Sequence, residues 1–208
     1  MIMRLTSAAL VALALASCGA PASQPQADPG LDARFLDIAK EYPSYGIVDY
    51  KFSWVQTLCR VFDPPARISA SADPETHGNK LYLLYAKDWD AYIKGIHGKQ
   101  PVGQVIVKET WDSRESDKEE PGDRGFTDRH GHSVARIEPA RKGDRWHYPT
   151  QRHALFIMLK SEDGWKFGTV SGDGRRVFQS GRISSCASCH WKADPDSLFG
   201  LPGRPSDR

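Results

Sequence analysis

The residues with the most specific chemistry are Cys186, Cys189 and His190, which form a Cys-Ala-Ser-Cys-His motif in this chain of 208 residues. In a C-x-x-C-H motif the two thiols attach a haem covalently, and the adjacent imidazole ligates its iron. One turn of helix within residues 184–192 would present all three side chains together. The motif therefore predicts one covalent haem c per chain, with His190 as the proximal iron ligand.

Two other interpretations of this cysteine pair fit the sequence less well. A structural zinc site needs further Cys or His ligands at matching spacing, and only Cys59 and Cys18 remain as other thiols. A thioredoxin-like redox pair lies early in an α/β unit, whereas this pair lies late in the sequence. Cys59 has no evident partner, and we expect it to be a buried free thiol.

The sixth ligand of the iron separates an electron carrier from a reactive site. Small electron-transfer cytochromes use a Met as the second axial ligand, and no Met or His follows His190. Met158 lies in the apolar run Leu-Phe-Ile-Met-Leu, which is typical of a core strand, so we expect it to be a packing residue. The sequence therefore predicts a five-coordinate iron with an open distal face that binds or activates small molecules.

The elements that must position the motif follow from the apolar pattern. Residues 31, 35, 38 and 42 have helical spacing and predict a helix that ends before Pro43, and Asp88 caps a second short helix over 88–94. Segments rich in β-branched and aromatic residues predict four strands, at 81–86, 102–111, 154–160 and 165–170. Asp163-Gly164 is predicted to be a hairpin turn. The expected fold class is α+β, a mainly antiparallel β-sheet with a few short helices.

A charged insertion, residues 112–152, interrupts what we expect to be a single domain over residues 31–208. Its first part, residues 112–130, mixes acidic and basic side chains and predicts a solvated loop. Its second part, from residue 136, is rich in basic residues.

The N-terminal sequence predicts export and lipidation. Residues 1–17 contain one Arg, an apolar run and small residues, as a lipoprotein signal peptide does. Leu-Ala-Ser-Cys is similar to the bacterial lipobox, which predicts that Cys18 is lipidated. Residues 18–30 predict a flexible tether. Because Gly follows Cys18, we expect a periplasmic domain that contacts the outer membrane through its lipid anchor alone.

Composition excludes other classes of protein. Lys and Arg number 28 against 26 Asp and Glu, so the formal net charge of +2 provides no basic surface for nucleic acid. Hydrophobic residues make up 39% of the chain and aromatic residues 10%, which is typical of a folded domain rather than a disordered one. The chain is short for two independent cores.

With these elements in this order, the chain resembles the cytochrome P-460 family, which includes the β-sheet cytochromes c′. The matching segments fall within about residues 45–200 and are 79–85, 101–109, 156–160, 164–168 and 186–190, followed by Ala193, Asp196 and Phe199. The resemblance implies a homodimeric antiparallel sheet that carries one five-coordinate haem c per chain. It also implies a protein that oxidises hydroxylamine or binds nitric oxide.

In the hydroxylamine-oxidising members of that family, a lysine is cross-linked to the porphyrin rim. The resemblance implies Lys108 as this residue, with Lys80 as the second candidate, while an ordinary solvent-exposed lysine stays an alternative for either. Glu109 follows Lys108 on the same strand, so we expect the two side chains to point to opposite faces. Glu109 is then not a distal proton acceptor if Lys108 reaches the haem.

Three functions are consistent with these predictions. The first is a hydroxylamine or nitric-oxide oxidoreductase, the second a non-catalytic nitric-oxide-binding cytochrome, and the third a plain electron-transfer haem lipoprotein. They imply a small gaseous or nitrogenous ligand or a redox partner that the sequence does not identify. The first two differ in whether a lysine is bonded to the porphyrin and whether a carboxylate or only aromatic side chains face the iron.

Overall fold

The computed structural model describes residues 28–48, 67–69, 78, 80–94, 98–120, 126–127, 133–134, 139–193 and 196–199. Cys18, Cys59 and the predicted signal peptide lie outside the described residues. The main sheet is antiparallel, with the strand order β1 (Gly46–Ile47), β3 (Leu81–Ala86), β4 (Val105–Ser116), β8 (Arg145–Ser161), β9 (Gly164–Ser171), β10 (Val177–Gly181). Two short strands extend it, since β2 (Arg67–Ile68) pairs with β3 and β7 (Ala140–Lys142) pairs with β8. A separate pair consists of β5 (Phe126–Thr127) and β6 (Ser133–Val134).

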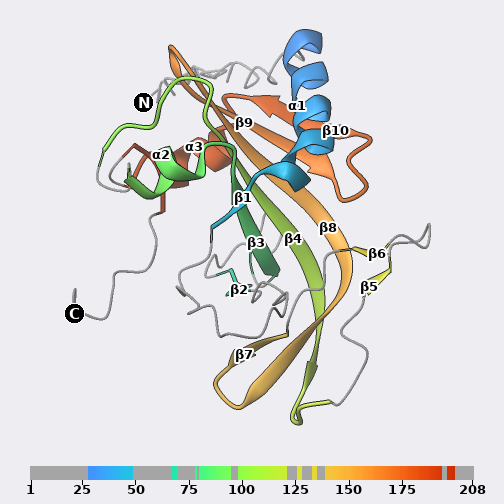
Figure 1. The fold of residues 1–208 in the computed structure, drawn as a ribbon. Helices are drawn as coiled ribbons and strands as arrows, with labels where there is room; N and C mark the ends of the chain where they lie inside the picture. Colours follow the sequence, from blue (N-terminus) through green and yellow to red (C-terminus); the bar gives the residue numbers. More distant parts are fainter. Residues whose placement is uncertain are drawn as a thin grey trace, which may run out of the picture.

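The helices lie on the two faces of this sheet (Figure 1). Helix α1 (Pro29–Glu41), continued by the 3-10 turn η1 (Tyr42–Ser44), covers one face, and α2 (Trp89–Lys94) and α3 (Ser184–His190) lie on the other. The predicted class, a mainly antiparallel sheet with a few short helices, is confirmed. Within the described ranges, none of the helices has the length and apolar character needed to cross a membrane.

The side chains of β4 point alternately to the two faces of the sheet, and the core accordingly consists of two clusters. Val105 and Val107 pack in the cluster that contains Phe35 and Ile38 of α1. Ile106 packs in the second cluster, with Phe167 and with residues of α2 and α3. Because successive side chains of a strand point to opposite faces, neighbouring residues of β4 lie in different environments.

Helix α1 begins two residues before the predicted start of the domain. The Asp28 side chain caps it, because Oδ1 accepts hydrogen bonds from the amides of Gly30 at 3.0 Å and Leu31 at 3.2 Å. Pro29 follows the cap, at the position where a missing N–H costs nothing. The last residues assigned to the tether are therefore the beginning of α1.

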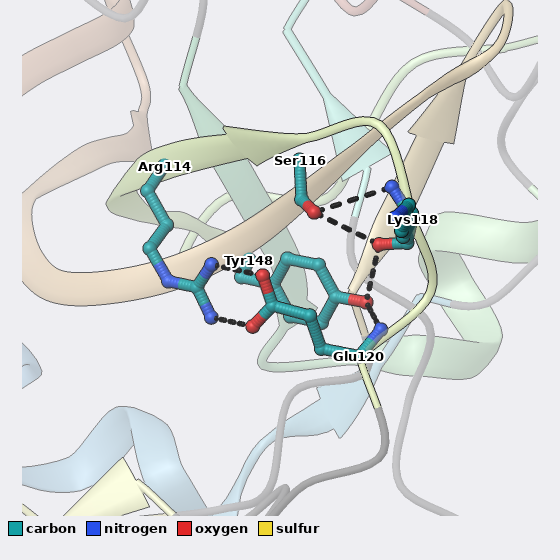
Figure 2. Close-up of polar contacts among 5 residues, drawn as sticks. All are labelled: Arg114, Ser116, Lys118, Glu120 and Tyr148. Atoms are coloured by element: carbon teal, nitrogen blue, oxygen red, sulfur yellow. Dashed lines mark hydrogen bonds and ion pairs between the residues drawn. The ribbon is translucent and has the colours of Figure 1, made fainter.

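The charged insertion also differs from its prediction, because β4 and β8 continue past the core as an arm, in which β7 pairs with the first residues of β8 (Figure 1). The sequence predicts a loop from residue 112, whereas pairing with β8 continues as far as Ser116. Figure 2 shows what stabilises the arm: Arg114 forms a two-pronged ion pair with Glu120, whose amide donates to the Tyr148 hydroxyl at 2.6 Å. Cross-strand charge and aromatic contacts of this kind stabilise a sheet.

Strands β8 and β9 form the predicted hairpin, with a turn one residue earlier than expected. Ser161 pairs with Gly164, so Glu162 and Asp163 are the two turn residues. Gly164 has φ of 114°, a conformation that favours glycine. The hairpin sets β9 beside β8 and so completes the wall against which α3 packs.

Candidate functional site

Helix α3 brings the C-x-x-C-H motif to a cavity between the helix and the sheet. The helix spans Ser184–His190, within the helical segment predicted over residues 184–192. Cys186 and His190 both line the cavity, and Cys189 is exposed beside it. Both cysteines are free thiols, and burial raises the pKa of Cys186.

The cavity has a volume of about 260 Å³ and mostly apolar walls. Strands β3, β4, β8 and β9, helices α2 and α3 and the segment after α3 contribute to it. The lining residues are Tyr82, Leu84, Tyr92, Ile106, Lys108, Phe156, Ile157, Met158, Phe167, Gly168, Cys186, His190, Leu198 and Phe199. Phe199 is 56% exposed, so the cavity reaches the protein surface on that side.

The His190 imidazole is held by three neighbours. Its Nδ1 lies 2.9 Å from the carbonyl oxygen of Ser197, and its ring centroid lies 5.1 Å from that of Phe199 and 5.5 Å from that of Phe167. A bond from Nδ1–H to a backbone carbonyl fixes the tautomer and leaves Nε2 as the nitrogen that can ligate a metal. Burial lowers the pKa of His190, which favours the neutral form that binds metals.

Lys108 enters the same cavity from β4. Its Nζ donates a hydrogen bond to Oγ of Ser69 at 2.9 Å and lies 4.1 Å from the centroid of the Tyr82 ring. Burial lowers the pKa of Lys108 to about 7. Near neutral pH this amine is therefore partly unprotonated, and an unprotonated amine is both a nucleophile and a possible metal ligand.

Lys80, the second lysine candidate, lies elsewhere. It precedes β3, its side chain is buried at 8% exposure, and the described part of the cavity wall does not include it. The structure therefore brings together Cys186, His190 and Lys108, and it leaves Lys80 out.

Glu109 lies on the opposite face from Lys108, as predicted. Its carboxylate accepts hydrogen bonds from the hydroxyls of Tyr42 at 3.1 Å and Tyr85 at 3.0 Å and pairs with Arg152 Nε at 2.5 Å. Burial raises the pKa of the Glu109 carboxyl, and the Arg152 charge opposes that rise. We call these four residues the Glu109 cluster. It packs under α1 and η1, away from the cavity.

Met158 combines an expected and an unexpected feature. It is buried on β8 at 7% exposure, in register with Ile106 and Phe167, as expected of a packing residue. It also lines the cavity that contains His190, which the sequence did not predict. A thioether at this position is a candidate second axial ligand.

The residues present fit a haem c. They offer two thiols at the required spacing and a carbonyl-anchored imidazole on an apolar wall. Among the described residues, no group of three or more Cys, His, Asp or Glu side chains is arranged to hold a metal ion. A haem requires no such group, because the porphyrin supplies four of the iron's ligands.

Several residues of the site carry no signal in the sequence. Ser69 reaches Lys108 from 39 positions earlier in the chain, and Ser197 meets His190 from an irregular segment. Tyr82, Tyr92 and Phe156 look like ordinary core residues until the sheet places them around one space. Only register and packing reveal these contacts.

No protein-family model matches this chain, and no curated protein matches it.

Replacing Lys108 by Met should make the pH dependence of stability shallower. The folded pKa of about 7 lies below the ordinary value of 10.5, so the unfolded chain binds more protons between these values and stability rises with pH. The parent protein should gain about 2 kcal/mol between pH 7 and pH 9 relative to the Met variant. Urea unfolding of the protein without a cofactor, at several pH values, measures this difference.

The control is Lys94→Met, because the Lys94 side chain is 80% exposed. Its stability difference from the parent should stay constant over the same pH range. A constant difference for Lys108→Met as well would show that Lys108 is charged in the folded protein.

Proposed function

We propose that this protein is an exported mono-haem c protein of the cytochrome P-460 type, with an open iron site that binds or oxidises small nitrogen species such as nitric oxide and hydroxylamine. The observation that carries the proposal is the carbonyl-anchored imidazole of His190 on the wall of an apolar cavity, with Cys186 on the same helix. Cys186 and Cys189 would hold the haem, and His190 would ligate its iron. When bound, the haem supplies an iron that takes a small ligand and exchanges electrons.

The chain's own residues give this site its selectivity. Aromatic and aliphatic side chains around the cavity exclude water and favour a small uncharged ligand. Lys108 is the one lysine of the described cavity wall, and near neutral pH its Nζ can give or take a proton. Ser69 and Tyr82 hold that amine, which makes Lys108 the candidate for a bond to the porphyrin rim.

The cellular setting belongs to the same proposal. Haem is attached covalently outside the bacterial cytoplasm, which agrees with the export signal in residues 1–17. Lipidated Cys18 would hold the domain at the outer membrane, in the periplasm. We further propose a homodimer that exchanges electrons with a redox partner.

Met158 supports a second candidate, an electron-transfer haem lipoprotein. Its position in the cavity would allow the sulfur to occupy the sixth position of the iron. Such a protein would carry electrons without binding a substrate at the iron.

The mass of the exported protein tests the proposal. Produced in a bacterium that attaches haem in its periplasm, the chain should carry the mass of one haem, and a protein without haem would refute the proposed function. Chemical cleavage of the thioethers then separates the reaction types. A porphyrin retained in the parent and in Lys80→Met, but lost in Lys108→Met, indicates the cross-linked, hydroxylamine-oxidising type. Complete release from the parent indicates a haem without this cross-link, as in the nitric-oxide-binding type or the electron carrier.

A further inference from the structure

The segment that follows α3 has an unusual backbone. Asp196 has φ of 54° and Ser197 has φ of 63°, so two consecutive non-glycine residues adopt the left-handed conformation. Side chains disfavour this region, and such residues persist where the surrounding structure holds them in place. The contacts of Asp196 show what holds them here.

Asp196 is bound from three directions. Its Oδ1 pairs with Lys160 Nζ at 2.5 Å, and its Oδ2 accepts a hydrogen bond from the backbone N–H of Gln100 at 2.8 Å. Its backbone carbonyl oxygen accepts a hydrogen bond from Trp165 Nε1–H at 2.8 Å. The ion pair is largely shielded from solvent, since the Lys160 and Asp196 side chains are 14% and 10% exposed. The end of β8 and the segment before β4 thus meet at the Asp196 carboxylate, and the start of β9 meets the Asp196 backbone carbonyl.

Ser197 connects this anchor to the imidazole. Its carbonyl oxygen lies 2.9 Å from His190 Nδ1, and its amide donates to the Ala193 carbonyl at 3.0 Å. Ser197, whose carbonyl orients His190, therefore directly follows Asp196, the residue that the sheet holds. An imidazole whose Nδ1–H is bonded in this way is a more basic ligand with a fixed ring orientation.

We propose that Asp196 is a positioning residue for His190, and that it sets how strongly the imidazole donates electrons to iron. This inference rests on the proposed function. Removing the carboxylate leaves Lys160 without its counter-ion and the Gln100 amide without its acceptor. The Ser197 carbonyl is then no longer held against Nδ1, the imidazole becomes a weaker donor, and the ferric state loses stabilisation.

The test compares Asp196→Ala and Asp196→Asn with the parent haem protein. Asn keeps an acceptor for the Gln100 amide but removes the charge that pairs with Lys160. In the Ala variant the ferrous-to-ferric ratio at a fixed potential should rise on the order of tenfold, an upward shift of about 59 mV for a one-electron couple. The iron–histidine vibration of the ferrous protein should weaken, and Asn should give intermediate values.

Asp163→Ala is the matched control. Asp163, in the turn of the β8–β9 hairpin, also pairs with cations, Lys166 and Arg182, but its side chain is 57% exposed and these two partners lie outside the segment after α3. Its potential and vibration should equal those of the parent. An equal shift in Asp163→Ala would overturn the proposal, because the effect would then be a general one.

The remaining outcomes are decisive as well. If Asp196→Ala does not fold, Asp196→Asn carries the test, and an unchanged potential and vibration in it would overturn the positioning role. Parent-like values in a folded Asp196→Ala variant with covalent haem would overturn it too, and would leave the proposed function intact. A parent protein without covalent haem would instead refute the proposed function and this inference together.

Discussion

Replacing Cys186 and Cys189 together by Ser should abolish covalent haem attachment. A hydroxyl does not form the thioether bonds that hold a haem c, and both thiols of α3 are free for that reaction. Haem-dependent absorbance that survives denaturation should fall to background. Denaturing electrophoresis with haem staining of the exported protein measures it.

Ser188→Ala is the control on the same helix. Among the described residues, the Ser188 hydroxyl donates to the Ser185 carbonyl, at 3.2 Å and in an exposed position, so haem attachment should continue in the Ala variant. A Cys186→Ser, Cys189→Ser variant that retained haem after denaturation, even with Lys108 also replaced by Met, would show that the motif does not attach it.

The haem iron should be five-coordinate, with His190 as its single protein ligand, and should give high-spin ferric and ferrous spectra at neutral pH. His190 is anchored through Ser197, and Met158 packs in register between Ile106 and Phe167. Nitric oxide should therefore bind at a rate that rises in proportion to its concentration, because no side chain has to leave first. Met158→Leu should leave both spectra and the binding rate unchanged, as measured by absorption and stopped-flow spectroscopy.

Two results would contradict this prediction in different ways. A low-spin spectrum that Met158→Leu abolishes would make Met158 the sixth ligand and favour the electron carrier. A low-spin spectrum that Lys108→Ala converts to high-spin would make the Lys108 amine the ligand.

The sequence predicted the elements whose pattern is local. Strand β3 has the predicted bounds, Leu81–Ala86, and α1 buries the predicted Phe35 and Ile38. The arm was not predictable in this way, because its strands mix charged, polar and aromatic side chains without a regular apolar period, and pairs that are distant in the sequence stabilise it. The Glu120 amide and the Tyr148 hydroxyl are 28 positions apart, and no local periodicity encodes their contact.

The candidate site also contains some residues that the sequence predicts and others that only the structure reveals. Cys186, Cys189 and His190 form a contiguous motif, and the position of Lys108 on its strand predicts its separation from Glu109. Nothing in the sequence distinguishes Lys108 from Lys80 by location, and only the sheet register places the first in the cavity. Asp196 and Ser197 contribute through backbone geometry and through partners on other elements, which a one-dimensional pattern does not contain.

The Glu109 cluster has a consequence for how the chain avoids misfolding. If β4 slipped by one residue against β3 and β8, all its side chains would exchange faces. Glu109 would then lie on the face of the aromatic cavity, and Lys108 on the face that carries Arg152, each desolvated without a counter-ion. Misregistered pairing of the central strands is therefore strongly disfavoured. The Glu109 cluster therefore favours the strand register in which Lys108 and His190 line one cavity.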